Sequence, residues 1–548
     1  LDAVDEGLAT TGVANGKAVC RATLPGPANT STPAGFEQHW NQADAAGCVP
    51  LNILGTNTEN AAAIAYAYRN ATEDFTYRQH VAAFNLNGSL FDGWAGPINT
   101  ALGGEYRFEK GFAVHNKLPF NVTNTNSPFG NDFGGSLSIL EGYAEANIPL
   151  LRDLPFAESV ELDAAFRHTH QTNKDAITSR SKTLDFNTWK VSATWDVTDW
   201  LRFRATRSRD VRAASFVDLY YNLPDTLPGP PAGTILNPWF LQANGAATND
   251  FTKIVFPPNF ALTPEVGNTL TLGVVLQPHG FLDGLRLSVD YYNIKITDAI
   301  VTLSAQQVVD ACFNAGVVCD KIFNGAGVTF DKLTADNRKD VENIVRGANN
   351  IGSFEQAGWD VELLYTLPLE KLGDKIPGRL TLRGLATITD KMDVNLGNGS
   401  GSISYLNQTG GSAFGGFTAP AKYILTGYVS YNVGGFGLTV DGKYIPKGIY
   451  DIRRSDTLPN TNLNSINYNY VESRFYVGLS TSYKFELGGN DSAEVFFTVR
   501  NLFDVDPPNA PSNVSGTLGY VQGGGAPTNP VFFDTLGATW RAGLRVNF

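Results

Sequence analysis

The sequence has little charge, almost no methionine and no long apolar run. Asp, Glu, Lys and Arg make up 17% of the 548 residues, whereas about 25% is usual in soluble domains. No stretch of about 18 consecutive apolar residues occurs, so the sequence predicts no transmembrane helix. The formal net charge is -12 and no basic run is present. This argues against nucleic-acid binding, which needs clustered Lys and Arg.

Local catalytic and metal-binding motifs are also missing. The sequence contains no G-x-S-x-G, H-E-x-x-H, P-loop or C-x-x-C pattern, so we predict neither enzyme activity nor a cofactor. His168 and His170 share one face of a predicted strand and could form a metal pair. A metal site normally needs a third and a fourth ligand. A structural role near the rim is therefore the favoured interpretation, and we predict no metal site.

The chain starts at Leu1 without a methionine, a charged n-region or an apolar h-region. We therefore expect residues upstream that are not part of this sequence. The four cysteines are Cys20 and Cys48 in one polar segment and Cys312 and Cys319 in another. We predict two disulfides in an oxidising compartment, although four cysteines allow three pairings.

The last ten residues show a strict alternation of apolar and polar side chains. One face carries Trp540, Ala542, Leu544, Val546 and Phe548, and the residues between them are polar, charged or glycine. A period of two indicates a β-strand. The apolar face reaches the terminal aromatic residue, which is typical of an outer-membrane barrel strand with lipid on one side and a polar lumen on the other.

About fifteen such segments of roughly ten to sixteen residues follow residue 75, longer than the usual five to six. Short turns alternate with long loops, as in outer-membrane barrels. We predict an all-β fold, an antiparallel transmembrane β-barrel whose long extracellular loops contain short helices. Residues 1–74 are predicted to be an extracellular loop with a short helix, and residues 75–548 the barrel. The predicted external loops are about 110–135, 210–263, 298–350, 393–420, 450–470 and 503–533.

One predicted strand, 285–297, changes phase along its length. Its first half alternates regularly through Leu287 and Val289 to Tyr291, whereas Ile294 and Ile296 fall on the other face. A change of phase within a strand is typical of a β-bulge, in which an extra residue shifts the alternation. The sequence therefore predicts a bulge near Asn293.

Six short motifs lie along the chain in a regular order: A-L-G-G-E-Y-R-F-E at 101–109, E-G-Y-A-E with I-P-L-L at 141–151, R-S-R-D-V-R at 207–212, N-F-A-L-T-P-E at 259–265, N-L-F-D at 501–504 and the terminal Phe548. Their order and spacing resemble the barrel of TonB-dependent outer-membrane receptors, over nearly the whole chain. The sequence departs mildly from that family at Ala214, where Pro is common, and at Asp218, where Glu is common.

The resemblance implies a barrel of about twenty-two strands, a plug domain, and a segment that binds a TonB-type energy-coupling protein. Because about fifteen strands are counted back from the last one, the first strand here is expected to be the eighth. The plug and the first strands are expected on a separate or missing piece. The implied function is active import of a scarce nutrient across the bacterial outer membrane, with release through the plug. A passive porin or a surface-binding barrel without energised import is the alternative, and a secreted β-rich enzyme or lectin is a third.

Two groups of residues are candidates for a role in transport. Arginines that alternate with outward apolar residues are predicted to line the lumen: Arg202, Arg204, Arg383, Arg500, Arg541 and Arg545. Residues in or beside the loop 210–263 are predicted to bind the solute: Arg212, Tyr220, Tyr221, Trp239 and Phe240. Aromatic faces there can stack on sugars or planar ligands, although packing within the loop is the simpler role for any one ring. The large loops favour a carbohydrate or other organic nutrient over an iron chelate.

Overall fold

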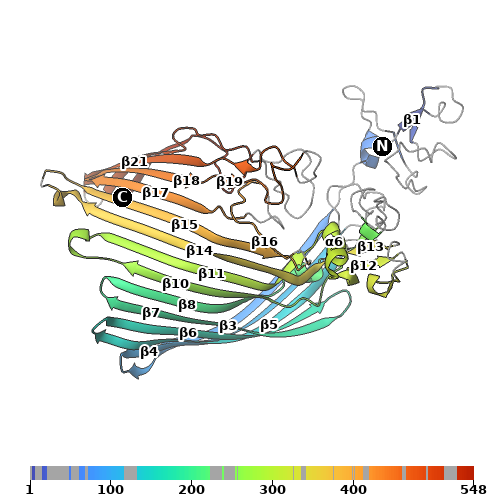
Figure 1. The fold of residues 1–548 in the computed structure, drawn as a ribbon, viewed down its shortest axis with the longest axis horizontal. Coiled ribbons are helices and arrows are strands. Elements are labelled where there is room, and N and C mark those ends of the chain that lie inside the picture. The colour runs from blue at the N-terminus through green and yellow to red at the C-terminus, as the bar shows by residue number, and fades with distance from the viewer. Residues whose placement is uncertain are drawn as a thin grey trace.

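One antiparallel sheet dominates the computed structural model (Figure 1). The structure describes residues 3–5, 15–20, 48–50, 61–67, 72–115, 132–221, 237–239, 253–255, 257–324, 326–334, 341–373, 375–397, 399, 401–410, 419–459, 465–488, 491–510 and 528–547. The predicted residues Phe240 and Phe548 lie outside these ranges.

Fifteen long strands form the sheet, and the short β16 (Ser402–Ser404) joins it beside β15. Their spatial order follows the chain, from β3 at one edge to β23 at the other. The predicted antiparallel all-β fold is thus confirmed. The long strands are β3 (Glu73–Gly93), β4 (Gly96–His115), β5 (Phe133–Leu154), β6 (Ala157–Asp175), β7 (Ser181–Thr198), β8 (Leu201–Arg212), β10 (Glu265–Leu276), β11 (Leu285–Thr302), β14 (Ala348–Pro368), β15 (Arg379–Asn395), β17 (Tyr423–Val433), β18 (Phe436–Ile445), β21 (Arg474–Gly488), β22 (Asp491–Arg500) and β23 (Thr539–Asn547).

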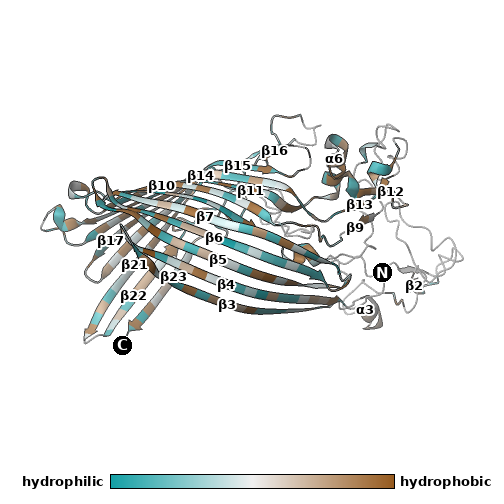
Figure 2. Cartoon of the chain, turned by 90° about the horizontal axis from the view of Figure 1, so that it is seen from below, coloured by the Kyte–Doolittle hydropathy of each residue, from teal (hydrophilic) through white to brown (hydrophobic). Residues whose placement is uncertain are grey.

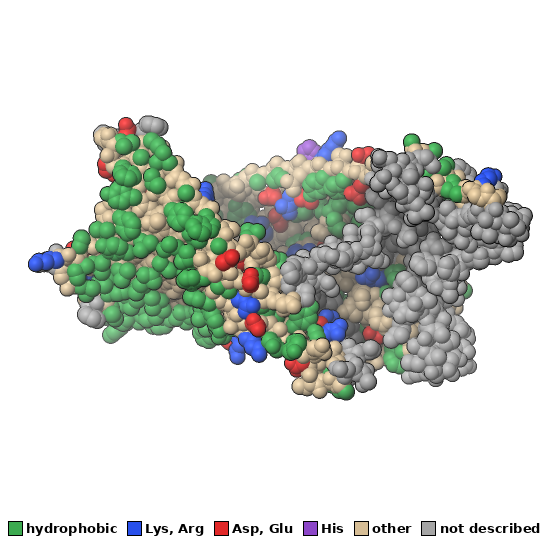
Figure 3. Space-filling model, turned by 90° about the horizontal axis from the view of Figure 1, so that it is seen from above, with side chains coloured by type: hydrophobic (Ala, Val, Ile, Leu, Met, Phe, Trp, Pro, Cys, Tyr) green, Lys and Arg blue, Asp and Glu red, His purple; other side chains and the backbone are tan. Residues whose placement is uncertain are grey.

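The two faces of this sheet differ in polarity. Residues directly opposite each other on neighbouring strands project from the same face. Leu544 lies opposite Val495, and with Trp540 on the same face these side chains are 65%, 49% and 71% exposed. Hydrophobic side chains cover much of the surface toward the short turns, while charged ones appear toward the long loops (Figure 3). One face is therefore suited to lipid and the other to a polar lumen.

The sheet curves into a wall but does not close. Strands β3 and β23 end the strand order, and no described strand pairs with the free side of either one. Figure 2 shows the two edges and the mixture of hydrophobic and hydrophilic residues along each strand. None of the helices in the described ranges has the length and apolar character that crossing a bilayer would require.

Short elements occupy the connections between the long strands. The connections at one end are tight turns, and those at the other end are long and carry most of these elements. The short elements are β1 (Ala3–Asp5), β2 (Ala18–Cys20), α3 (Ala61–Ala67), α4 (Phe216–Tyr220), β9 (Lys253–Val255), η3 (Gly280–Leu282), α6 (Ala305–Ala315), η4 (Cys319–Lys321), β12 (Ile322–Asn324), η5 (Phe330–Lys332), β13 (Val341–Val345), η7 (Leu369–Lys371), β19 (Gly448–Ile449) and β20 (Tyr470–Val471).

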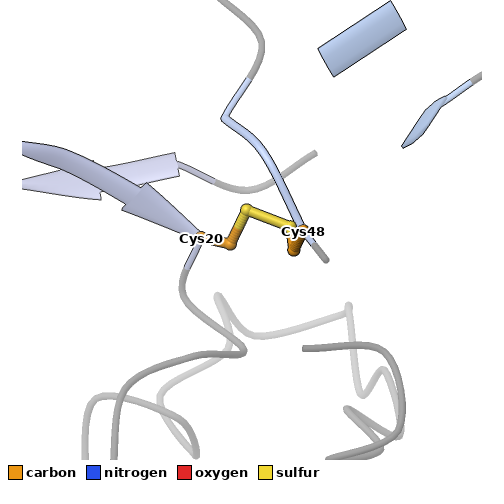
Figure 4. Close-up of a disulfide and its surroundings, with 2 residues drawn as sticks. All are labelled: Cys20 and Cys48. Carbon is orange, nitrogen blue, oxygen red and sulfur yellow. A yellow bond between two sulfur atoms is a disulfide. The ribbon is translucent and has the colours of Figure 1, made fainter. Parts of the chain in front are cut away.

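The four cysteines form two disulfides, which confirms the prediction and settles the pairing. Cys20 at the end of β2 is bonded to Cys48 (Figure 4). Cys312 in α6 is bonded to Cys319 at the start of η4. The second disulfide lies in a buried apolar core formed by the long loops, in which Val309, Ile322 and similar residues are fully buried.

The loop core around Cys312 should loosen when its disulfide is removed. In the double variant Cys312→Ser/Cys319→Ser we expect amides of α6 and η4 to exchange hydrogen faster, because closing this short loop contributes roughly 2–3 kcal/mol in the chain-entropy model. Hydrogen-exchange mass spectrometry measures this change. The control Cys20→Ser/Cys48→Ser should leave α6 unchanged. Equal exchange in α6 with and without the Cys312–Cys319 bond would show that apolar packing alone holds the loop.

The predicted bulge near Asn293 is wrong. Strand β11 pairs with β10 without interruption through this residue, and its register against β14 shifts only between Ile296 and Ile300, around Asp298. The phase change has another cause: Ile296 lies opposite Phe354, which packs against the loop core. Ile296 thus has an apolar neighbour on the inner face, whereas Ile294 on the same face is 36% exposed, and the alternation inverts without an extra residue near Asn293.

Candidate functional site

A charged clamp fixes the start of the long loop after β8. Arg212 donates from Nε and Nη2 to the two carboxylate oxygens of Glu265 at 2.6 and 2.9 Å, and from Nη1 to Asp218 at 3.3 Å. Glu265 also accepts the backbone N–H of Ile300 at 2.6 Å. Asp218 and the N-cap Ser215 form a capping box, which satisfies the free N–H groups at the start of α4. The clamp thus ties α4 to β8, β10 and β11.

Seven aromatic side chains gather around α4 at the loop end of the sheet. Ring centroids are 4.6 Å apart for Phe216 and Tyr220, 5.4 Å for Tyr220 and Phe260, and 5.5 Å for Phe133 and Tyr221. These separations favour mutual packing of rings. The members, called here the aromatic cluster, are Phe75, Tyr77, Phe133, Phe216, Tyr220, Tyr221 and Phe260.

The aromatic cluster has a buried side and an open side. Tyr220 is 2% exposed and donates its hydroxyl to the carbonyl of Ser136 at 2.9 Å, and burial raises the pKa of its hydroxyl. Phe75 and Tyr77 are 49% and 45% exposed and lie 5.9 and 6.2 Å from the ring of Phe216. Tyr220 therefore anchors the loop to β5. Phe75 and Tyr77 expose their rings to a solute that enters from the loop end of the sheet.

A polar group borders the open side of the aromatic cluster. The ring of His115 is 6.2 Å from Phe133, its Nε2 is 2.8 Å from Glu73 and its Nδ1 is 3.7 Å from Asp132. Burial first, and then the charge of Glu73, raise the pKa of the Tyr221 hydroxyl, so Tyr221 stays a neutral donor at ordinary pH. Carboxylates and a phenol beside exposed rings suit a ligand that has both hydroxyl groups and flat faces.

The predicted solute-binding residues do not form one group. Tyr220 and Tyr221 belong to the aromatic cluster, and Arg212 supports it through Asp218. Trp239 packs in the separate loop core, 4.6 Å from Phe330 and 5.7 Å from Phe313. Phe240 lies outside the described residues. Solute binding by these residues stays a prediction, centred on Tyr221.

The lumen arginines are largely paired with carboxylates on the inner face. Arg204 donates from Nε to a carboxylate oxygen of Asp290 at 2.7 Å. Three more of the predicted lumen arginines pair with a carboxylate in the same way, and Arg541 and Arg500 are the two exceptions. Arg541 lies 5.8 Å from the ring of Phe496, and Arg500 is opposite Thr539 at the loop end of β22. The other pairs are Arg202 with Asp196, Arg383 with Glu362 and Arg545 with Glu494.

A polar groove of about 950 Å³ runs along the wall of the barrel and is lined by residues of successive strands from β3 to β8. On the inner face, the hydroxyl of Tyr143 donates to Asn85 and the guanidinium of Arg167 lies 5.1 Å from the Tyr143 ring. Glu145 and Asp163 line the same groove. The groove offers donors and acceptors in the middle of the wall, beyond the aromatic cluster.

The histidine pair lies on the outer face and not in the lumen. Nδ1 of His170 is 2.7 Å from Asp185, and Nδ1 of His168 is 2.7 Å from Asn187. All four residues are on β6 and β7, nearer the loop end of the sheet than Phe166. Phe166 faces outward and is 51% exposed. Among the described residues no group of three or more His, Cys, Asp and Glu side chains is placed to hold a metal ion.

Sequence reasoning missed most of the aromatic cluster. Phe75 and Tyr77 alternate at the start of β3, and this pattern placed them only in a strand. Their meeting with Phe133 and Phe216 depends on how β3, β5 and α4 are arranged in space. The one local sequence signal for this site was the pattern Ser215-x-x-Asp218, which predicts that a helix begins close to Tyr220.

The apolar outer face, the polar lumen and the long loops at one end define an outer-membrane-type β-barrel. The family model for the TonB-dependent receptor-like β-barrel matches residues 25–502, and the chain belongs to this family. It is accordingly a protein of the bacterial outer membrane. A comparison with curated proteins found no match.

Several solved structures are similar to this chain at low sequence identity. The FrpB iron transporter of Neisseria meningitidis is 13% identical with a TM-score of 0.50, covering 86% of this chain and 55% of that one. The ferric enterobactin receptor PfeA of Pseudomonas aeruginosa is 17% identical with a TM-score of 0.48, covering 79% and 49%. The ferric-catecholate import receptor Fiu of E. coli is 13% identical with a TM-score of 0.44, covering 79% and 52%. The chain thus spans about half the length of these structures.

Proposed function

We propose that this chain forms most of the barrel of a TonB-coupled importer for a scarce nutrient. The main support is membership of the TonB-dependent receptor β-barrel family over residues 25–502. The free sides of β3 and β23 supply a second argument, because unpaired backbone groups in lipid cost several kcal/mol each. A plug and further strands, supplied by another part of the receptor, complete the wall in this proposal. Energy from the TonB-type partner moves the plug and releases the solute inward.

The solute enters at the aromatic cluster and then meets the polar groove. Phe75, Tyr77 and Tyr221 supply ring faces at the loop end, and Glu73 supplies a hydrogen-bond acceptor beside them. This combination suits a carbohydrate or another organic nutrient with hydroxyl groups and apolar faces. The donors and acceptors of the groove around Arg167 would then take over its hydrogen bonds.

Removal of the exposed rings should weaken solute binding. For Phe75→Ala/Tyr77→Ala we expect a loss of affinity of about tenfold, since each ring contact contributes about 0.5–1.5 kcal/mol. Isothermal titration with a panel of oligosaccharides and ferric chelates identifies the ligand and measures the change. The control Tyr468→Ala/Tyr470→Ala removes two exposed rings from a different loop and should have no effect. Equal losses in both variants would place the solute elsewhere, and tight binding of a ferric chelate would overturn the carbohydrate assignment.

Energised import and passive diffusion give different uptake behaviour. Uptake by the intact receptor should stop when the TonB-type partner is deleted or the proton gradient is collapsed. A passive porin would continue to admit solute at the same rate. A surface-binding protein would bind the solute without any uptake at all. Accumulation of radiolabelled solute in cells, measured with and without the partner, separates the three possibilities.

A further inference from the structure

We propose that the open side of the aromatic cluster binds an organic ammonium group, so that the imported solute is a cation. The inference rests on the proposed function only in taking this cluster as the place where the solute enters, and it adds the charge of the solute. Ring faces carry negative electrostatic potential and attract ammonium groups within about 6 Å of the ring centre. Neighbouring carboxylates strengthen that attraction. Rings and carboxylates occur together at the loop end of β3.

Three rings of the aromatic cluster, Phe75, Tyr77 and Phe216, form an arrangement called here the open box. The ring centroids of Phe75 and Tyr77 are 6.3 Å apart, and their planes are inclined by only 21°. The ring of Phe216 in α4 is steeply inclined to both, at 68° to Phe75 and 89° to Tyr77. Phe216 can approach because Gly111, directly opposite Tyr77, has no side chain: a Cβ there would lie 2.6 Å from the Phe216 ring. Since Phe75 and Tyr77 are about half exposed, a compact cation can reach these rings.

Carboxylates lie beside the open box. Alternate residues of a strand share one face, so Glu73, Phe75 and Tyr77 follow one another on the inner face of β3. Glu73 is 44% exposed and contacts His115 through Oε2 at 2.8 Å, while its Oε1 has no partner in the described part of the chain. Asp132 is 42% exposed and lies 3.7 Å from the other nitrogen of the same ring. One histidine thus faces two carboxylates, and the surroundings stay negative even when that histidine is protonated.

The exposed rings of the open box have no cation of their own. At another loop a lysine already fills such a place, since Nζ of Lys447 is 4.1 Å from the ring centre of Tyr470. Within the described ranges no Lys or Arg side chain lies over Phe75 or Tyr77 in this way. Arg212 at the base of α4 is already held by the two carboxylates of the clamp. The place over these rings is therefore left for a cation from outside.

From the open box to the polar groove, the inner face of β4, β5 and β6 carries more acids than arginines. Glu105 lies directly opposite Glu141, so two carboxylates stand side by side. Arg107 contacts Glu105 at 3.7 Å and Glu109 at 3.2 Å, and the strip as a whole stays negative. Such a strip attracts cations and repels anions. The acids are Glu105, Glu109, Glu141, Glu145 and Asp163, and the arginines are Arg107 and Arg167.

Two probes of equal shape test the charge of the solute. Choline carries a trimethylammonium group, and its neutral isostere carries a tert-butyl group in the same place. Both are titrated by ligand-observed NMR against the whole receptor, isolated from outer membranes in a polyoxyethylene detergent. We expect choline to bind about tenfold more tightly than the isostere, because only the charged group gains from the rings and from Glu73.

Variants of the open box and of its acidic border locate the binding site. In Phe75→Leu/Tyr77→Leu the affinity for choline should fall about tenfold, because both ring faces are lost. In Glu73→Gln it should fall about threefold, while the affinity for the neutral isostere stays the same. The matched control Glu472→Gln removes an exposed carboxylate from a different loop and should leave choline binding unchanged.

Three outcomes would overturn the proposal: no binding of choline, equal affinity for choline and its isostere, and an equal loss in Glu73→Gln and Glu472→Gln. Folding of each variant is checked by the mobility of the unheated barrel in a gel, and the comparison of the two probes needs no variant. Energised uptake of a neutral solute would refute the ammonium site and leave import in place. Choline binding by a receptor whose uptake continues without the TonB-type partner would leave the ammonium site in place and refute energised import.

Discussion

Replacing Glu265 by glutamine should release α4 from the barrel wall. Glu265 accepts hydrogen bonds from Nε and Nη2 of Arg212 and from the backbone N–H of Ile300. Its side chain is only 13% exposed. Glu265→Gln keeps the size of the side chain but removes the charge that holds Arg212. Hydrogen bonds between charged groups contribute about 1.5–3 kcal/mol each, so we expect local opening at α4 to become roughly 10 to 100 times more frequent.

A helix of five residues cannot compensate for this loss. Isolated helices shorter than about 12 residues are marginal in water, so α4 depends on its cap at Ser215 and on the clamp. As α4 opens, Phe216 leaves Phe75 and Tyr77, and the affinity for the solute should fall with it. Hydrogen exchange of residues 213–221 measures the opening, and titration with the identified solute measures the affinity.

The inner wall offers a matched control for the clamp. Arg383 and Glu362 form a similar pair at 2.8 Å on β14 and β15, and both side chains are nearly half exposed. Exposed ion pairs contribute about 0–1 kcal/mol, so Glu362→Gln should leave exchange at α4 unchanged. If Glu265→Gln leaves α4 as protected as the control does, the buried residues Leu219 and Tyr220 hold the loop without the clamp.

The barrel could be predicted from sequence because its signal is local. The alternation of Trp540, Ala542 and Leu544 reflects lipid on one side and water on the other, and a similar contrast occurs in other strands, such as Leu201 to Arg204 of β8. The short turns and long loops could likewise be counted along the chain. Prediction failed at Ile294 and Ile296, two apolar residues on the inner face of β11. Ile296 lies opposite Phe354, which packs against the distant loop core, and a pattern along one strand does not contain such a contact.

The candidate site could be predicted only in part, since it depends on contacts between distant segments. Tyr220 and Tyr221 were found because they lie in a long loop. Phe75 and Tyr77 are more than a hundred residues away and meet α4 only in the folded wall. Arg212 was predicted to touch the solute, whereas its bidentate bond to Glu265 gives it a supporting position. Which residue a long side chain pairs with depends on the register between neighbouring strands. The alternation of apolar and polar residues along a single strand does not give that register.

The turn between β10 and β11 should tolerate no side chain at Gly284. This residue has a φ of +95°, and a Cβ built on it would lie 2.2 Å from the carbonyl oxygen of Thr366 in β14. The carbonyl of Gly284 in turn accepts the N–H of Thr366 at 3.0 Å. Gly284→Ala therefore adds both a strained dihedral, about 1–3 kcal/mol, and an overlap with backbone, about 1–3 kcal/mol more.

The same turn contains the control for this substitution. Gly280 also has a positive φ of +72°, but a Cβ there meets nothing within 4 Å, so Gly280→Ala should cost only the conformational strain of about 1–2 kcal/mol. The temperature at which the folded barrel band disappears from an unheated-sample gel series measures both variants. We expect a clearly larger fall for Gly284→Ala. Equal falls would mean that the neighbouring strand β14 moves aside readily, and the tight contact between Gly284 and Thr366 would then not be what aligns β11 with β14.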